Sequence, residues 1–122
     1  MKHRFAPLLL ALLFLWTAVP AAYTEGENKM PERTIYLAGG CFWGMERLMS
    51  LVPGVIDAQS GYANGTKAHP TYEEVCRGDT GHRETVKVTY DPDRVQLQSL
   101  LKLYFSVVDP LTPNRQGNDI GS

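Results

Sequence analysis

The sequence of 122 residues is poor in cysteine, in long apolar runs and in excess charge of either sign. Its two cysteines, Cys41 and Cys76, allow one disulfide at most, which excludes a small fold held together by a disulfide framework. Twelve basic and thirteen acidic residues give a net charge of −1. There is no internal repeat and no low-complexity segment, and 43% hydrophobic with 20% charged residues is the composition of one globular domain.

The longest apolar run, "LLLALLFLWTAV", covers residues 8–19 and is too short to span a bilayer core of about 30 Å. It follows the basic start "MKHRF" and precedes the small residues "PAA", which is the layout of a secretory signal peptide over residues 1–21, cleaved after Ala21. An uncleaved membrane anchor is the alternative, and the lack of cysteine in residues 1–40 excludes a lipid-modified N-terminal cysteine. Cleavage would leave ten basic and thirteen acidic residues, which argues weakly against nucleic acid or an anionic membrane as a partner. We therefore expect an exported protein, periplasmic or extracellular.

Residues 22–32 are polar, which indicates a linker, so the domain is expected over residues 33–122. Alternating and helical apolar periods, bounded by turn residues, predict its elements. They are a strand at 33–40, a helix at 43–52, a strand at 55–62, a short helix opened by the capping box Thr71–Glu74, a strand at 83–90, a helix at 97–108 and a loop-like tail. This order predicts an α+β fold in which helices cover one face of a sheet.

Cys41 is the first candidate for chemistry, because it lies where the first strand ends and the first helix starts. Unpaired backbone N–H groups and the positive end of the helix dipole converge there, and both favour a thiolate. Gly39 and Gly40 allow a tight turn and a close approach to a ligand. Phe42 and Trp43 follow directly and suit either packing or the apolar wall of a small-ligand site. A buried structural cysteine is the alternative.

Glu84 is the second candidate, because alternation along residues 83–90 places it on the same face as Val86, Val88 and Tyr90. Desolvation on that apolar face would raise its pKa and keep the carboxyl protonated. A protonated carboxyl is a hydrogen-bond donor and a general acid. The alternative is that Glu84, near the strand end, reaches water.

Four further residues carry weaker signals. Tyr72 offers a phenol at the start of the short helix, although a packing role is the commoner one. His82 is a possible base in a loop, where histidines are usually solvated, and Asp119 suits a turn as well as an active-site carboxylate. Cys76 follows Val75 in the short helix, which favours its burial.

A thiolate, a neutral acid and an aromatic wall together suit the reduction of a sulfoxide. The sulfur of a sulfoxide is electrophilic, but its oxygen leaves poorly unless it is protonated. A thiolate would attack the sulfur, the acid would protonate the oxygen and the rings would receive the methyl group. The cysteine would become a sulfenic acid that a second thiol must reduce. A thiol hydrolase that uses Cys41 and His82 is the competing hypothesis for an enzyme.

Three motifs resemble those of the A class of peptide methionine sulfoxide reductases. They are "GGCFWGMERL", then "SGYANGTKAHPTYEEVCRGDTGHRETVKVTYDP", and then "RQGNDIG", and the resemblance runs from about Thr34 to Ser122. It implies a two-layer sandwich with a ferredoxin-like, split β-α-β core. It implies reduction of the S epimer of methionine sulfoxide, free or in oxidised proteins, by a monomer without metal or organic cofactor. The electrons would come from an external thiol such as thioredoxin or dithiothreitol.

The resemblance also implies one role for each matching position. These roles are nucleophile for Cys41, holders of the substrate methyl for Phe42 and Trp43, protonated acid for Glu84, binding of the sulfoxide oxygen for Tyr72 and lining of the site for Asp119.

Two departures from the family pattern stand out. The family continues beyond "GNDIG" with another active-site tyrosine and a last strand, which would pair beside residues 33–38, whereas this sequence ends at Ser122. Many members also carry a resolving cysteine near the C-terminus, and here Cys76 is the one remaining candidate, at a position that is not a resolving one. The expectation is a domain incomplete at its C-terminus. The alternative to an enzyme is an impaired fragment that at most binds oxidised-methionine peptides.

Overall fold

The computed structural model describes residues 29–120. The expected signal peptide at 1–21 and the first part of the linker, 22–28, lie outside the described residues. Within the described part, no helix combines the length and the apolar character needed to cross a membrane. In chain order the elements are β1 (Arg33–Leu37), α1 (Phe42–Ser50), β2 (Val55–Ala63), α2 (Tyr72–Cys76), β3 (Arg83–Tyr90), α3 (Leu97–Val107), β4 (Arg115–Gln116) and β5 (Asp119–Ile120).

The main sheet has three strands in the order β1-β3-β2, and β3 pairs antiparallel with both neighbours. Strands β1 and β2 therefore run parallel to each other on either side of β3, which is the split β-α-β arrangement. The register sets Leu37 opposite Val86 and Tyr62 opposite Glu84. The end of β1, the end of β2 and the start of β3 consequently lie at the same end of the sheet.

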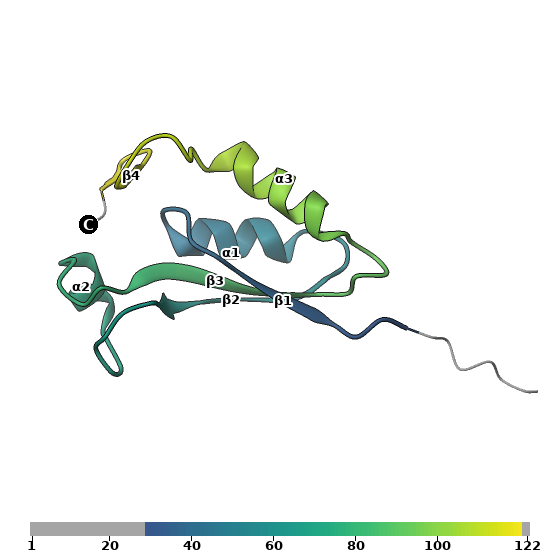
Figure 1. Cartoon of the computed structure of the whole chain (residues 1–122), viewed down its shortest axis with the longest axis horizontal. Helices are drawn as coiled ribbons and strands as arrows, with labels where there is room; N and C mark the ends of the chain where they lie inside the picture. Colours follow the sequence, from purple (N-terminus) through teal and green to yellow (C-terminus); the bar gives the residue numbers. More distant parts are fainter. Residues whose placement is uncertain (1–28, 121–122) are drawn as a thin grey trace, which may run out of the picture.

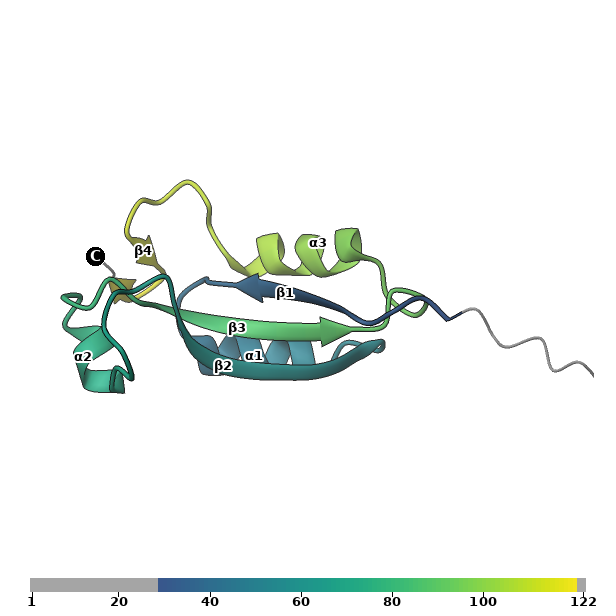
Figure 2. The ribbon, with the colours of Figure 1, turned by 60° about the horizontal axis from the view of Figure 1, so that its bottom comes forward.

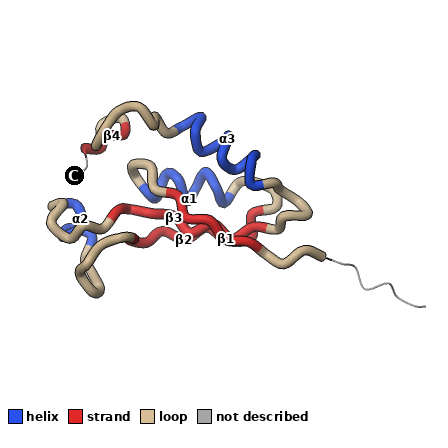
Figure 3. Tube along the Cα trace, viewed as in Figure 1, coloured by secondary structure: helices blue, strands red, loops and turns tan. Residues whose placement is uncertain are grey.

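Helices α1 and α3 cover one face of this sheet, and α1 packs against β2 and β3 (Figure 1). Figure 2 brings the opposite face forward, where the strands are not covered by either helix. Figure 3 shows the same two layers by type of secondary structure. The expected α+β fold with helices on one face is confirmed.

The core lies between the two layers and follows the alternation of the strands. On β3, Val86, Val88 and Tyr90 are almost fully buried, whereas Lys87 between them is exposed. Burial of each such apolar side chain contributes about 1.5–3 kcal/mol to folding. The buried cluster comprises Leu37, Phe42, Met45, Met49, Val86, Val88, Tyr90, Val95 and Leu100.

The tail differs from the prediction that it is loop-like throughout. Strands β4 and β5 form a small antiparallel hairpin, with Arg115 opposite Ile120 and Gln116 opposite Asp119. Gly117 turns the chain with φ 59°, in the left-handed region that glycine enters without steric cost. Strands of two residues are too short to show an alternating pattern, so nothing in the sequence period indicates them. The hairpin lies at the same end of the sheet as α2 (Figures 1 and 2).

Candidate active site

The β1–α1 turn presents Cys41 at the surface. Cys41 is the N-cap residue of α1, and its backbone carbonyl accepts a hydrogen bond from the Met45 N–H at 3.4 Å. Its thiol makes no capping bond, and the residue is exposed and free of any disulfide. The structure therefore removes the alternative of a buried structural cysteine. Gly40, just before it, has φ 77°, so the turn requires a residue that tolerates the left-handed region.

Three long-range contacts hold this turn in place. The Tyr104 hydroxyl of α3 donates to the Ala38 carbonyl oxygen at 2.5 Å. A Cβ on Gly39 would lie 2.5 Å from Cγ2 of Val108, and one on Gly40 would lie 2.8 Å from Cγ of Gln116. The turn thus fits closely between α3 and the β4–β5 hairpin. Neither Tyr104 nor Gln116 was a candidate from the sequence, because only the tertiary structure brings them to this turn.

Four aromatic rings cluster beside Cys41. Phe42 is buried, and its ring lies 5.3 Å from Trp43, 5.6 Å from Tyr62 and 6.2 Å from Tyr72, centroid to centroid. Trp43 and Tyr72 are themselves in contact, with their centroids 5.3 Å apart, and both are partly exposed. The cluster is therefore an apolar wall that solvent can reach. The sequence analysis did not single out Tyr62. Its position as the last residue of the predicted strand 55–62 was a usable signal, because it pairs with Glu84 across the sheet.

A cavity of about 620 Å³ opens next to this wall. Its sides come from the β1–α1 turn, α2, the start of β3 and the tail. Among its lining residues are Gly40, Tyr72, Cys76, Glu84, Tyr104 and Asp119. Tyr72, Glu84 and Asp119, which were singled out from the sequence, therefore face one cavity. Residues 38–40 of the β1–α1 turn line it as well, whereas Cys41, Phe42 and Trp43, which follow in the chain, are not among its lining residues.

Glu84 lies in the environment that its position in the strand predicts. Its Oε1 atom is buried and has no hydrogen-bond partner among the described residues. Burial raises the pKa of the Glu84 carboxyl, and the negative charge of Asp119 raises it further. The Asp119 carboxylate lies against the turn as well, since its Oδ2 would be 3.4 Å from a Cβ on Gly40. A neighbouring carboxylate and a desolvated site both favour the protonated form of Glu84.

The tyrosines of the site keep their protons. The Cys76 thiol, as hydrogen-bond partner and as a charge, raises the pKa of Tyr72 to about 12, with smaller effects of burial, Glu84 and Cys41. Burial raises the pKa of Tyr62, and the charge of Glu84 adds to it. Both phenols are therefore hydrogen-bond donors at neutral pH.

Cys76 is exposed, so the prediction that it is buried is wrong. α2 has five residues and turns its buried side inward through Val75, while Cys76 lies one turn after Tyr72 and lines the cavity. In this short helix Val75 is the one buried residue. The prediction assumed that Cys76 is buried because it follows the apolar Val75.

His82 is half-buried and engaged at both ring nitrogens. Its Nδ1 accepts from the Gly65 N–H at 3.2 Å, and its Nε2 lies 2.8 Å from the Lys67 carbonyl oxygen. A histidine bonded in this way is not available as the base of a thiol hydrolase. Within residues 29–120, no group of three His, Cys, Asp or Glu side chains is placed to hold a metal ion.

Comparison with known proteins gives independent evidence of the family to which the chain belongs. The family model "Peptide methionine sulfoxide reductase" matches residues 33–122. The peptide methionine sulfoxide reductase MsrA of Picrophilus torridus is 54% identical over 91 residues, which are 75% of this chain and 51% of that protein. The MsrA of Lachnoclostridium phytofermentans is 54% identical over 89 residues, 73% of this chain and 54% of that protein. The chain thus spans about half the length of these curated relatives.

Two solved structures share the fold. Methionine sulfoxide reductase A of Corynebacterium diphtheriae matches with a TM-score of 0.71 at 43% identity, over 74% of this chain and 42% of that one. Mxr1 from Saccharomyces cerevisiae, in its reduced form, matches with a TM-score of 0.68 at 37% identity, over 74% of this chain and 54% of that one.

Proposed function

Because the chain belongs to the peptide methionine sulfoxide reductase family, we propose that it reduces methionine S-sulfoxide, free or in oxidised proteins, to methionine. One observation carries the proposal. An exposed thiol at the start of α1 lies beside an aromatic wall, at the same end of the sheet as a carboxyl whose pKa is raised by burial. These are the three groups that the reaction needs.

In the proposed mechanism the Cys41 sulfur attacks the sulfoxide sulfur while Glu84 delivers its proton to the sulfoxide oxygen. Phe42 and Trp43 receive the methyl group, and the Tyr72 phenol donates a hydrogen bond to the oxygen. The substrate sulfur gains two electrons and leaves as a thioether. Cys41 loses them and ends as a sulfenic acid, which carries the oxygen. Asp119 contributes by raising the pKa of Glu84 and so helping to keep the transferable proton in place.

An external thiol completes the cycle. Two thiol groups of a thioredoxin-like protein, or of dithiothreitol, reduce the sulfenic acid to Cys41 thiol, release water and form their own disulfide. The electrons come from thiols throughout, so the proposed chemistry involves no metal and no organic cofactor, and a monomer suffices for it.

The decisive experiment uses the two epimers of methionine sulfoxide. We expect the purified chain with dithiothreitol to consume the S epimer and to leave the R epimer, as measured by chromatography of the dabsylated amino acids. Absence of S-epimer turnover, with binding of an oxidised-methionine peptide retained, would instead favour the non-enzymatic alternative. The exposed thiol of Cys41 and the raised pKa of Glu84, at the same end of the sheet, favour the enzyme.

We also propose that the protein is exported by its N-terminal segment. Basic residues, an apolar run of twelve and small residues up to Ala21 support this. N-terminal sequencing of the product from a bacterial host should begin at Ala22 in the periplasm or medium. Retention of residues 1–21 in a membrane fraction would show an anchor instead.

A further inference from the structure

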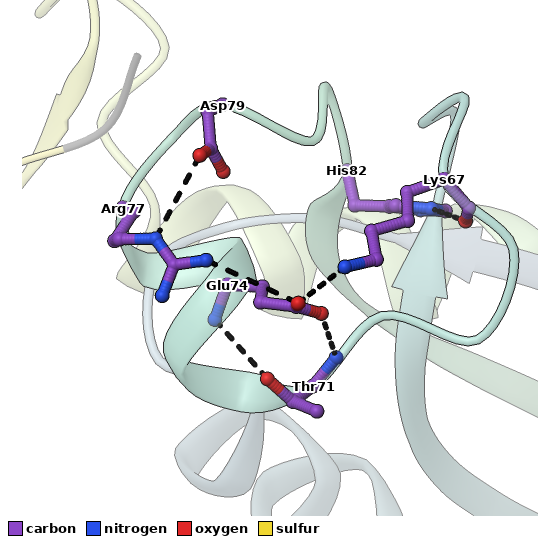
Figure 4. Close-up of polar contacts among 6 residues, drawn as sticks. All are labelled: Lys67, Thr71, Glu74, Arg77, Asp79 and His82. Carbon is purple, nitrogen blue, oxygen red and sulfur yellow. Dashed lines mark hydrogen bonds and ion pairs between the residues drawn. The ribbon is translucent and has the colours of Figure 1, made fainter.

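His82 fastens the loop between β2 and α2 to the start of β3. Its Nδ1 accepts the Gly65 N–H. Its Nε2 lies within hydrogen-bond distance of the Lys67 carbonyl oxygen (Figure 4). A carbonyl oxygen can only accept, so these partners select the neutral tautomer with its proton on Nε2. The His82 ring also packs edge-on against Tyr62, with 6.5 Å between the centroids.

The connection continues from the loop into α2. The Lys67 ammonium pairs with Oε1 of Glu74, and the other oxygen of Glu74 accepts the Thr71 N–H at 2.9 Å. The Thr71 hydroxyl in turn accepts the Glu74 N–H at 3.3 Å, which completes the capping box (Figure 4). Tyr72 is the first residue of the helix that this box opens. A continuous set of contacts therefore joins His82 to the backbone of Tyr72.

The loop packs tightly against the imidazole of His82. A Cβ on Gly65 would lie 2.1 Å from Cδ2 of the His82 ring and 2.6 Å from its backbone nitrogen. A backbone hydrogen bond, from the Thr66 N–H to the Thr80 carbonyl oxygen at 3.1 Å, joins the same loop to the segment that precedes His82. The position of the loop thus depends on the imidazole that fills this contact.

His82 stands two residues before Glu84, directly before the first residue of β3. The carboxyl of Glu84 is positioned by β3 and the core, whereas the phenol of Tyr72 is positioned by α2, which has only five residues. The Tyr72 ring also packs on Phe42 and Trp43, and the contacts through His82 add a hydrogen-bonded link from α2 to the segment that leads into β3. Both groups line the same cavity.

We propose that His82 is a positioning residue. Through Lys67 and Glu74 it holds Tyr72 at the place where its phenol and the Glu84 carboxyl reach one sulfoxide oxygen. This inference rests on the proposed function. His82 also lines the cavity, but both of its ring nitrogens are engaged by the loop, so it has no free ring nitrogen to offer the substrate.

A kinetic cycle tests the inference in the full chain. His82→Phe keeps a ring against Tyr62 and removes both hydrogen bonds to the loop. We expect KM for methionine S-sulfoxide to rise about tenfold with kcat changed less than threefold, because one hydrogen bond to the bound oxygen is misplaced. Tyr72→Phe should act in the same direction, and adding His82→Phe to it should cause little further loss. The control His69→Asn, an exposed residue of the same loop at a left-handed φ, should behave as the wild type.

A second readout does not depend on turnover. In hydrogen exchange, amides of residues 72–78 should exchange faster in His82→Phe, while those of α1 should be unchanged. Lys67→Met, at an exposed side chain outside the buried core, should give the same pattern, and its surface control Lys102→Met should not.

The two hypotheses fail in different ways. A wild-type chain without S-epimer turnover overturns the proposed function. Turnover with losses that multiply in the double variant, or protection of α2 that is unchanged in both His82→Phe and Lys67→Met, overturns the positioning role.

Discussion

Replacing Glu84 by glutamine separates proton donation from hydrogen bonding at the site. The amide has nearly the shape of the carboxyl and can still donate a hydrogen bond to the sulfoxide oxygen, but it has no proton to transfer. Burial raises the pKa of Glu84 and so favours its protonated form, and this substitution removes the proton that the carboxyl could transfer.

The expected loss follows from the size of general acid catalysis. A positioned acid contributes about 10²–10⁴ to a rate, which corresponds to about 2.7–5.5 kcal/mol of transition-state stabilisation. We therefore expect kcat of Glu84→Gln to fall at least about a hundredfold. KM should change by less than about threefold, since the aromatic wall and Tyr72 remain.

Although the substitution should lower kcat, it should raise the stability of the folded chain at high pH. The folded chain holds the Glu84 proton more tightly than the unfolded chain does, so its free energy of unfolding falls as the pH rises above the usual value of 4.5 and through the raised pKa. Glutamine does not ionise. The midpoint of thermal unfolding should therefore be higher for Glu84→Gln than for the wild type at pH 8, and the difference should shrink toward pH 4.

Single-turnover formation of methionine from the S-sulfoxide, read by chromatography between pH 5 and 9, measures the chemical step. Wild-type rates should decline as the pH rises through the pKa of Glu84, and the variant should not show this decline. Glu73→Gln, an exposed acid on α2, serves as the matched control. A Glu84→Gln rate within threefold of the wild type would refute the assignment of the acid.

Three further outcomes are expected. Cys41→Ser should abolish turnover and also the dimedone adduct that the wild type forms after one turnover without reductant; an adduct in the variant would point to another sulfur. Trp43→Ala should raise KM about tenfold with little change in thermal midpoint, because 58% of the residue's surface is exposed; an unchanged KM would remove it from the substrate wall. Gly39→Ala should lower the free energy of unfolding by about 1–3 kcal/mol, since its Cβ would meet Val108 at 2.5 Å. In urea unfolding, the control Gly44→Ala, with open space around its Cβ, should not be destabilised.

Regular patterns made much of the fold predictable. The predicted strand 83–90 and β3 have the same bounds, because alternation over eight residues is a strong signal. The capping box at Thr71 is confirmed with both of its hydrogen bonds. β1 is shorter than predicted and ends at Leu37, since the two glycines turn away to pack against α3 and the tail.

Local patterns were less informative about the site. Period-two alternation was enough to place Glu84 on the buried face of its strand. It was not enough to show that Asp119 approaches the β1–α1 turn or that Tyr62 packs on Phe42, because these contacts join segments far apart in the sequence. The exposure of Cys76 was missed because five residues are too few for a helical period to settle which side is inward.

The groups of the site rest on two kinds of support, and this difference has a kinetic consequence. Cys41 and Glu84 are carried by elements that share the buried core, whereas Tyr72 and Asp119 are carried by a five-residue helix and a two-residue strand. Core packing resists displacement, while side-chain hydrogen bonds and exposed ion pairs each contribute only about 1 kcal/mol. Substitutions in the surface contacts should therefore change substrate binding and leave attack by the thiol nearly intact. Substitutions in the core under Cys41 and Glu84 should lower the rate and the stability together.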